Sequence, residues 1–287
     1  MDTLKTLEIP GHVTIGAGRG GLPVVRIETA WSTAEIYLHG AQVTRFERKG
    51  DSPLLFMSAA SEFQAGKAIR GGVPLIFPWF GARDGMPAHG FARLADWDLV
   101  STSVLPEGSV RLHFKLPPDD EFEVDFTVTV GATLTMELAV TNTGSSDFTF
   151  ENCLHTYFHI RSIARTVIAG LQGTRYLDQL TGDHHTEANE FIRIAGETDR
   201  IYQDTHATVE IRDSEIRRAI RVRKSGSRST VVWNPWREKS IRMADFGEHE
   251  YLHMICVESG NLRENSITLA PGESSLLAVE LDSVPLG

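Results

Sequence analysis

FEVDFTVTV, residues Phe122–Val130, is the stretch of sequence that decides the fold, because apolar and polar residues alternate along its whole length. After a short interruption at Gly131 and Ala132, the alternation resumes over residues 134–140. An alternation with a period of two places every second side chain on the same face of a β-strand. The two runs therefore predict a β-hairpin with one buried face.

Shorter runs of the same kind recur along the chain, at 24–28, 35–38, 43–47, 110–116, 209–212, 220–223, 230–233 and 276–281. Turn-forming clusters separate the runs, at 49–53, 106–109, 143–145 and 271–273. Helical periods are scarce, and the best helix candidates are short, at 58–64 and 235–245. We therefore expect an all-β sandwich of large antiparallel sheets with few short helices. Because no linker, composition shift or internal repeat interrupts the chain, we expect one domain over residues 1–287.

The charge balance limits the partners that the protein can bind. The formal net charge of the 287 residues is -10, so the long-range field repels nucleic acids and anionic membranes. An anionic small substrate would need a local cationic pocket. No apolar stretch reaches membrane-spanning length, and residues 1–11 lack an apolar signal core. We expect a cytoplasmic protein, and the two cysteines, Cys153 and Cys256, lie in apolar runs typical of buried reduced thiols.

Two motifs suggest a cofactor or a metal but lack the structural context that these groups require. Gly16–Gly21 satisfies GxGxxG, yet a strand-like run follows it where a dinucleotide site needs a helix. His249 and His253 satisfy HExxH, yet a β-like run follows at 254–257. In a strand, residues four apart are about 13 Å apart, which is too far to share a zinc ion. We predict neither a cofactor nor a metal, and keep a zinc hydrolase through His249 and His253 as a minor alternative.

Two further histidine pairs invite a metal interpretation. His155 and His159 lie in a run that is typical of a strand. His184 and His185 lie between turn-forming and polar residues, and we interpret them as part of a solvated loop.

Six polar and aromatic segments beside turns carry the functional signal: RGGVPLIFPWFG (70–81), HGFAR (89–93), LHTYF (154–158), YLDQL (176–180), TVVWNPW (230–236) and CVESGN (256–261). Together and in this order, they resemble the aldose 1-epimerase superfamily, specifically its hexose-6-phosphate mutarotase (glucose-6-phosphate 1-epimerase) branch. Any one segment alone would be a weak signal. The resemblance implies a galactose-mutarotase-like β-supersandwich with an open cleft on one concave sheet. It also implies a metal-free acid–base mechanism on a phosphorylated hexose.

The resemblance assigns a role to six residues, taken one by one: His155 as acid, Glu258 as base, Arg70 and Arg93 beside the phosphate, and His89 and Asp178 as sugar contacts. The chemistry explains these residue types. Mutarotation removes the proton from the anomeric O1 hydroxyl and donates one to the ring oxygen O5, for which a carboxylate and an imidazole suffice. Arginine presents a forked set of donors that suits phosphate oxygens.

One departure from the branch and one rival function stay open at this point. Ala88 precedes His89, where some members carry a glutamine that contacts substrate, and this weakens the assignment to glucose 6-phosphate in particular. The rival is a carbohydrate-binding β-sandwich without catalysis, which needs no acid–base pair. We expect a monomer with no nucleic-acid or membrane partner.

Overall fold

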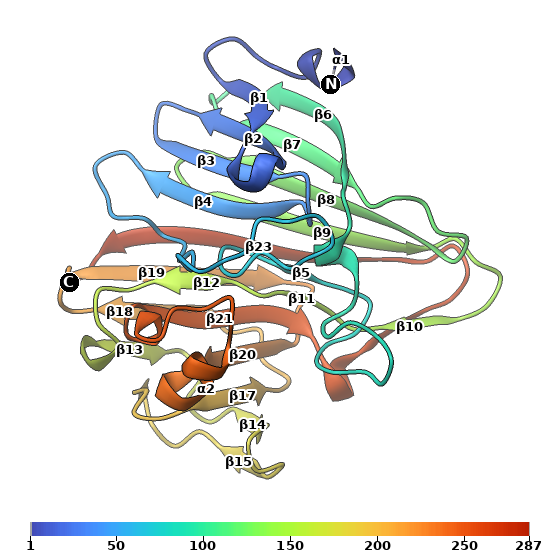
Figure 1. Ribbon diagram of the computed structural model, residues 1–287. Coiled ribbons are helices and arrows are strands. Elements are labelled where there is room, and N and C mark those ends of the chain that lie inside the picture. Colours follow the sequence, from blue (N-terminus) through green and yellow to red (C-terminus); the bar gives the residue numbers. More distant parts are fainter. Residues whose placement is uncertain (1, 287) are drawn as a thin grey trace.

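A computed structural model describes residues 2–286 of the chain (Figure 1). Its longest sheet has nine antiparallel strands in the order β16-β13-β18-β19-β23-β9-β8-β7-β6. The strands are β6 (Asp98–Val104), β7 (Val110–Lys115), β8 (Phe122–Val130), β9 (Leu134–Asn142), β13 (Thr166–Ala169), β16 (Phe191–Ile192), β18 (Val209–Asp213), β19 (Arg218–Ser225) and β23 (Ser274–Pro285). The predicted hairpin is confirmed as β8 and β9, in which every residue of the predicted apolar series is buried.

The second large sheet has eight strands in the order β15-β14-β17-β20-β21-β11-β5, with β12 also paired to β21. Its strands are β5 (Leu75–Ile76), β11 (Asn152–Leu154), β12 (Tyr157–His159), β14 (Arg175–Asp178), β15 (His184–Thr186), β17 (Thr198–Tyr202), β20 (Ser229–Asn234) and β21 (Met254–Asn261). The loop predicted at His184 and His185 is wrong. Both residues are solvent-exposed, as expected, but they pair with β14 as an edge strand.

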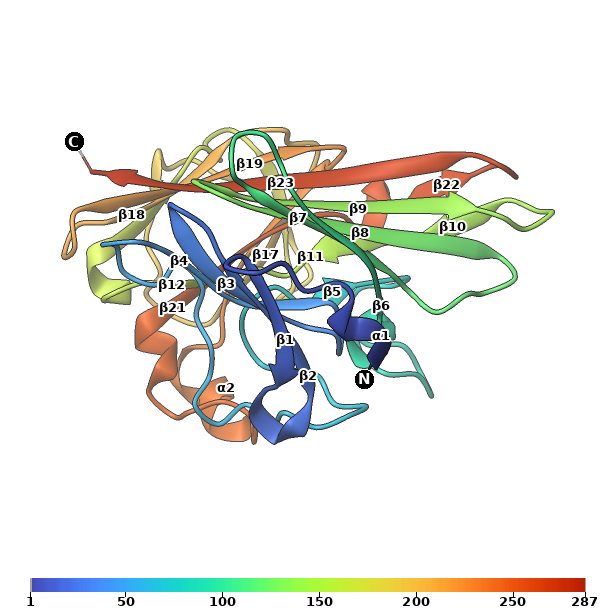
Figure 2. The same ribbon diagram turned by 90° about the horizontal axis from the view of Figure 1, so that it is seen from above.

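Two smaller sheets complete the β-structure. One has four strands, β1 (Val13–Ala17), β2 (Pro23–Glu28), β3 (Ser32–Tyr37) and β4 (Gln42–Arg48), and the other joins β10 (Phe148–Phe150) to β22 (Ile267–Leu269). Figure 2 shows β23, β9 and β8 side by side as one layer, with helix α2 (Trp236–Arg242) on the far side of β21 from that layer. The sheet carrying β21 therefore has one face toward the nine-stranded sheet and one face toward α2.

Strand β21 shows how the sequence divides between these two faces. Ile255 and Val257 join the main apolar core, which also contains side chains from β2, β8 and β23. Met254 and Cys256 point to the opposite face and join a smaller apolar cluster. Because Glu258 continues the second series, the alternation carries its side chain to the face on the side of α2.

Helices are few and short, as predicted. They are α1 (Asp2–Lys5), α2, and the 3-10 turns η1 (Arg19–Gly21), η2 (Ala92–Leu94), η3 (Ile163–Arg165), η4 (Glu250–His253) and η5 (Arg263–Asn265). The predicted helix at 235–245 is confirmed as α2, and the GxGxxG segment ends β1 and turns into β2. The helix predicted at 58–64 is wrong: this stretch is irregular, and the backbone N–H groups of Ser58 and Ala59 donate to Arg70 O and the Glu250 carboxylate. No helix within residues 2–286 combines the length and apolar character needed to span a membrane.

Candidate active site

A cleft of about 310 Å³ opens on the face of the eight-stranded sheet that carries Glu258. Its lining brings together segments that are far apart in the sequence: Arg70, Phe80, Gly81, His89, His155, Tyr157, Gln179, Asp199, Trp233, Lys239, Met243 and Glu258. Four of the six predicted site residues are in this set. The other two, Arg93 and Asp178, are not among the lining residues.

His155 and Glu258 meet at the floor of the cleft. His155 Nε2 lies 3.2 Å from Glu258 Oε1, and the two side chains are only 9% and 1% exposed. The strand predicted through His155 is interrupted, since β11 ends at Leu154 and β12 begins at Tyr157. The His155 N–H donates to Pro74 O, and the imidazole stacks on the Tyr157 ring with 4.8 Å between centroids. These contacts fix the ring with one edge toward Glu258.

Burial governs the protonation of this pair. It raises the pKa of Glu258 well above the usual carboxyl value, and the charge of Asp199 adds to that effect. It lowers the pKa of His155 well below the usual imidazole value, assisted by His89, Arg93 and Arg70. Both shifts penalise the charged form, so a neutral imidazole beside a protonated carboxyl group is favoured. Besides the N–H of the neutral imidazole, the two groups then share one titratable proton.

Arg70 lies on one wall of the cleft and is fixed by two partners. Its Nε donates to Asp245 Oδ2 at 3.1 Å, and its Nη1 donates to the Tyr157 hydroxyl at 2.9 Å. The two glycines that follow have positive φ, and a side chain at either would collide with neighbouring backbone, at Phe56 O for Gly71. Glycine is therefore required for the turn that presents Arg70.

His89 lies in the loop before η2, and Arg93 lies within η2; this segment passes beside Phe77, just after β5. Gly90 lies so close to Phe77 O that a Cβ there would be 1.9 Å from it, and Gly90 has a φ of +70°. The Gly81 N–H donates to His89 Nδ1 at 3.2 Å, so this nitrogen is unprotonated. Arg93 donates from Nη2 to Ala88 O at 2.7 Å, while its buried Nε has no partner.

Positive charge is concentrated around His89, in a protein whose net charge is -10. Burial lowers the pKa of His89 to about 3, and four cations reinforce the shift: Arg93, Arg70, Arg263 and Lys239. Burial likewise lowers the pKa of Arg93 to about 10, with Arg70 as the second cause. The cleft therefore has the local cationic character that an anionic substrate would need.

The opposite wall supplies polar residues that the sequence reasoning missed. Asp199 accepts a hydrogen bond from Gln179 Nε2 and lies 3.9 Å from Lys239 Nζ. Lys239 also stands over the Trp233 ring, at 5.7 Å. Asp199 belongs to none of the motifs found in the sequence, so no local signal points to it. Lys239 lies within the helix predicted at 235–245, but nothing in the sequence marks it as a site residue. Asp178, the predicted sugar contact, uses Oδ1 to accept from the Leu180 N–H, and its neighbours Gln179 and Asp199 line the cleft instead.

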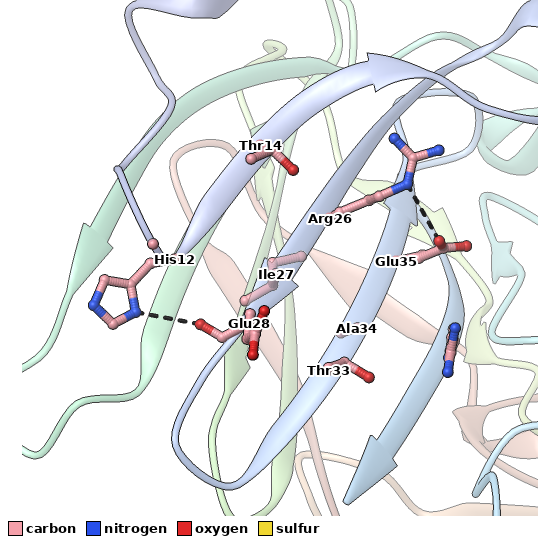
Figure 3. A pocket seen from close by; sticks show the side chains of 10 residues that line it. His12, Thr14, Arg26, Ile27, Glu28, Thr33, Ala34 and Glu35 are labelled. Carbon is pink, nitrogen blue, oxygen red and sulfur yellow. Dashed lines mark hydrogen bonds and ion pairs between the residues drawn. The ribbon is translucent and has the colours of Figure 1, made fainter. Parts of the chain in front are cut away.

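A second hollow lies on the four-stranded sheet (Figure 3). Its charged groups already have partners, since Arg26 Nε is 3.4 Å from Glu35 Oε1 and His12 Nδ1 is 3.2 Å from Glu28 O. No residue that lines this hollow is among the buried polar atoms left unpartnered in residues 2–286. It therefore offers less to a ligand than the cleft with His155 and Glu258.

The HExxH motif does not form a metal centre in the described chain. The predicted β-like run at 254–257 is confirmed as the start of β21, but Glu250–His253 form the 3-10 turn η4 directly after His249, so the strand context predicted for His249 and His253 is wrong. The Glu250 carboxylate accepts from the backbone N–H groups of Gly247 and Ala59, which holds the turn in place. His253 Nδ1 bonds to Arg161 O at 2.8 Å.

One other group of side chains is close enough to share an ion. Donor atoms of His155, Cys256 and Glu258 lie within 4.8 Å of one another. Burial raises the pKa of both Cys256 and Glu258, so both keep their protons, and a metal would first have to displace these.

Known proteins and a family model match most of the chain. Residues 23–281 match the family model described as aldose 1-epimerase. A protein of Cenchrus ciliaris, provisionally named a glucose-6-phosphate 1-epimerase, is 35% identical over 88% of this chain and 82% of its own. A protein of Escherichia coli with the same provisional name is 32% identical over 85% of this chain and 84% of its own.

Solved structures extend the agreement to the fold. A Salmonella typhimurium protein provisionally described as a mutarotase (YeaD) superposes with a TM-score of 0.89, at 26% identity, over 99% of both chains. The structure of HI1317 superposes with a TM-score of 0.83, at 28% identity, over 96% of this chain and 97% of its own. These neighbours confirm the predicted galactose-mutarotase-like fold, and the chain belongs to the aldose 1-epimerase family.

Proposed function

We propose that the protein interconverts the α and β anomers of a hexose 6-phosphate, with glucose 6-phosphate as the first substrate to test, by metal-free acid–base chemistry. The observation that carries the proposal is the distance of 3.2 Å between His155 Nε2 and Glu258 Oε1 at the floor of a cationic cleft. The family supports sugar anomer interconversion, and the provisional names of the relatives support the phosphorylated substrate.

The reaction needs one group to accept a proton and one to donate a proton at neighbouring oxygens. The base removes the proton of the O1 hydroxyl, the acid protonates O5, and the C1–O5 bond breaks as a carbonyl forms at C1. Rotation about C1–C2 and the reverse steps close the ring as the other anomer. O1 and O5 are both bonded to C1, so two adjacent side chains can reach them together.

The pair suits this exchange because His155 Nε2 and Glu258 Oε1 share one titratable proton, so one of the two atoms can donate while the other accepts. In our proposal, Glu258 accepts from O1 and His155 donates to O5, which requires the imidazolium–carboxylate form. That form has the same total charge as the neutral pair that burial favours, and it differs only in which of two atoms 3.2 Å apart holds the proton. The negative charge of a bound phosphate would favour the imidazolium.

We assign phosphate binding to the cationic side of the cleft. Arg70 and Arg93 are the principal donors, with Lys239 close to the opening. The unpartnered Nε of Arg93 supports this role, because a buried donor without an acceptor is costly until a ligand supplies one. His89 and the carboxylate of Asp199 are proposed as sugar contacts, and Asp178 stays a prediction of the same kind.

The test is a comparison of two substrates by exchange NMR at equilibrium. The proposal predicts that the protein accelerates anomer exchange of glucose 6-phosphate with a higher kcat/KM than that of glucose. Equal kcat/KM values would remove the phosphate assignment and leave mutarotation intact. Binding of the sugar without any acceleration would favour the rival carbohydrate-binding function.

Two expectations from the sequence accompany the proposal. We expect the protein to act in the cytoplasm and as a monomer. Ala88, which stands where some members of the branch carry a substrate-contacting glutamine, offers only its backbone O to Arg93. Mannose 6-phosphate and galactose 6-phosphate therefore belong in the same assay.

A further inference from the structure

We propose that Cys153 is a positioning residue for Glu258: its thiol donates to Oε2 and holds the carboxyl group so that Oε1 faces His155. The inference rests on the proposed function, because it assigns a task to Glu258 in that reaction. The two oxygens of Glu258 have separate partners. Oε1 lies 3.2 Å from His155 Nε2, and Oε2 lies 3.6 Å from Cys153 Sγ.

The strand register explains how the thiol reaches the carboxyl group. Cys153 on β11 is the cross-strand partner of Gly260 on β21, and Glu258 lies two residues before Gly260 on the same face. The diagonal neighbour of a cross-strand pair is within reach of a side chain that leans along the strand. Cys153 is fully buried, so the thiol has little freedom to leave this position.

Gly260 provides the space that this arrangement needs. A Cβ at residue 260 would lie 2.4 Å from Asn152 O and 3.0 Å from Cys153 Sγ. The φ of Gly260 is outside the left-handed region, so its backbone conformation is open to any residue. Glycine is therefore needed at residue 260 for lack of space: a side chain there would keep β11 and the Cys153 thiol from lying so close to β21.

A thiol can orient a base while lowering its pKa less than a hydroxyl group would. Burial raises the pKa of Cys153, and the neighbouring Glu258 adds to that effect, so the sulfur keeps its proton and acts as a donor. The S–H group is a weak donor, whereas a serine hydroxyl is a stronger one. A stronger hydrogen bond to the carboxylate would stabilise its charged form and lower the basicity of Glu258.

The other charged and titratable groups around Glu258 come from several elements. They are His155 between β11 and β12, Tyr157 on β12, Cys256 on β21, Asp199 on β17 and Arg93 on η2, with Lys224 on β19 acting on Cys153. Asp199 raises the pKa of Glu258, and Arg93 opposes it. All of these groups remain in place when only residue 153 is changed.

The experiment compares Cys153→Ser and Cys153→Ala with Cys256→Ala, a matched loss of a fully buried thiol that has no hydrogen bond to Glu258 among those described. The readout is the pH dependence of kcat for anomer exchange. The alkaline limb, where the pair loses its proton and Glu258 becomes charged, should move to lower pH in Cys153→Ser and to higher pH in Cys153→Ala. Cys153→Ala should also lower kcat about 3–10-fold with KM unchanged. Cys153→Ser should recover most of that kcat, and Cys256→Ala should leave the limb in place.

A second readout separates this inference from the proposed function. The carboxyl C=O band of Glu258, identified by its loss in Glu258→Gln, is titrated by infrared difference spectroscopy without any substrate. If the wild type proves inactive, the proposed function fails, and the band still reports whether residue 153 shifts the titration of Glu258 in opposite directions for Ser and Ala. Midpoints that match the wild type in both variants would overturn the role of Cys153. If Cys153→Ala does not fold, the direction of the Cys153→Ser shift decides the question.

Discussion

Arg70 and Asp245 form a close ion pair at the edge of the cleft, with both Nε and Nη2 within about 3.1 Å of the same carboxylate oxygen. Asp245 and the Tyr157 hydroxyl hold the guanidinium from two sides, so its position is set before any ligand arrives. Because these contacts already hold the Arg70 side chain in place, it would lose less conformational entropy on binding a phosphate.

Arg70→Ala is expected to raise KM for glucose 6-phosphate more than it lowers kcat. A phosphate remote from C1 contributes binding that is nearly equal in the ground state and the transition state. The loss of charge-assisted contacts should raise KM about 10–100-fold, and Arg93→Ala should act in the same direction. Arg26→Ala, in the hollow of Figure 3, is the matched control and should leave KM unchanged. Wild-type KM values in both cleft variants would show that the phosphate binds elsewhere.

The pH profile of kcat should have a broad maximum across neutral pH. A second proton on the pair must charge His155, whose pKa is lowered by burial, so the acid limb lies below the usual imidazole range. Loss of the last proton must charge Glu258, whose pKa is raised by burial, so the alkaline limb lies well above the usual carboxyl range. Asp199→Asn should move the alkaline limb to lower pH, because it removes a charge that raises the pKa of Glu258.

Rates at saturating substrate measure this profile, since phosphate esters titrate at about pH 6 and would distort kcat/KM. A narrow maximum, with limbs at the ordinary values of a histidine and a carboxylate, would contradict the burial argument.

The sequence predicted the strands well where one face is buried along a whole run. β8 and β9 follow from alternation alone, because the core needs every second side chain. The helix expected at 58–64 did not form, and long-range contacts hold this stretch in an irregular conformation, such as the hydrogen bond from the Ala59 N–H to the Glu250 carboxylate. Local patterns contain no information on such contacts.

The site could be predicted only in part, for a similar reason. The segments around His155 and Glu258 carry a family pattern in the sequence. Asp199 does not, and it reaches the cleft because β17 pairs with β20, which sets Asp199 opposite Trp233. The link between Cys153 and Glu258 depends on the register of β11 against β21, which no single segment encodes.

Chelation should leave the activity unchanged. The mechanism proposed here moves protons between side chains and sugar oxygens, and none of its steps uses a metal ion. Anomer exchange is measured before and after dialysis against EDTA, alongside metal analysis of the protein. His253→Gln, which alters the HExxH motif at an exposed position, should also retain full activity. Activity lost on chelation and restored by zinc would overturn the mechanism.

The central claim, that His155 and Glu258 move the protons, is tested most directly by anomer exchange in Glu258→Gln. This change keeps the size of the side chain and removes its basicity. Exchange NMR at saturating glucose 6-phosphate should show kcat reduced about 10²–10⁴-fold, with sugar binding retained. His155→Ala should have a similar effect, and the double variant should be far less impaired than the product of the two single effects, because the pair serves one event. A correctly folded Glu258→Gln protein with near wild-type kcat would contradict the account.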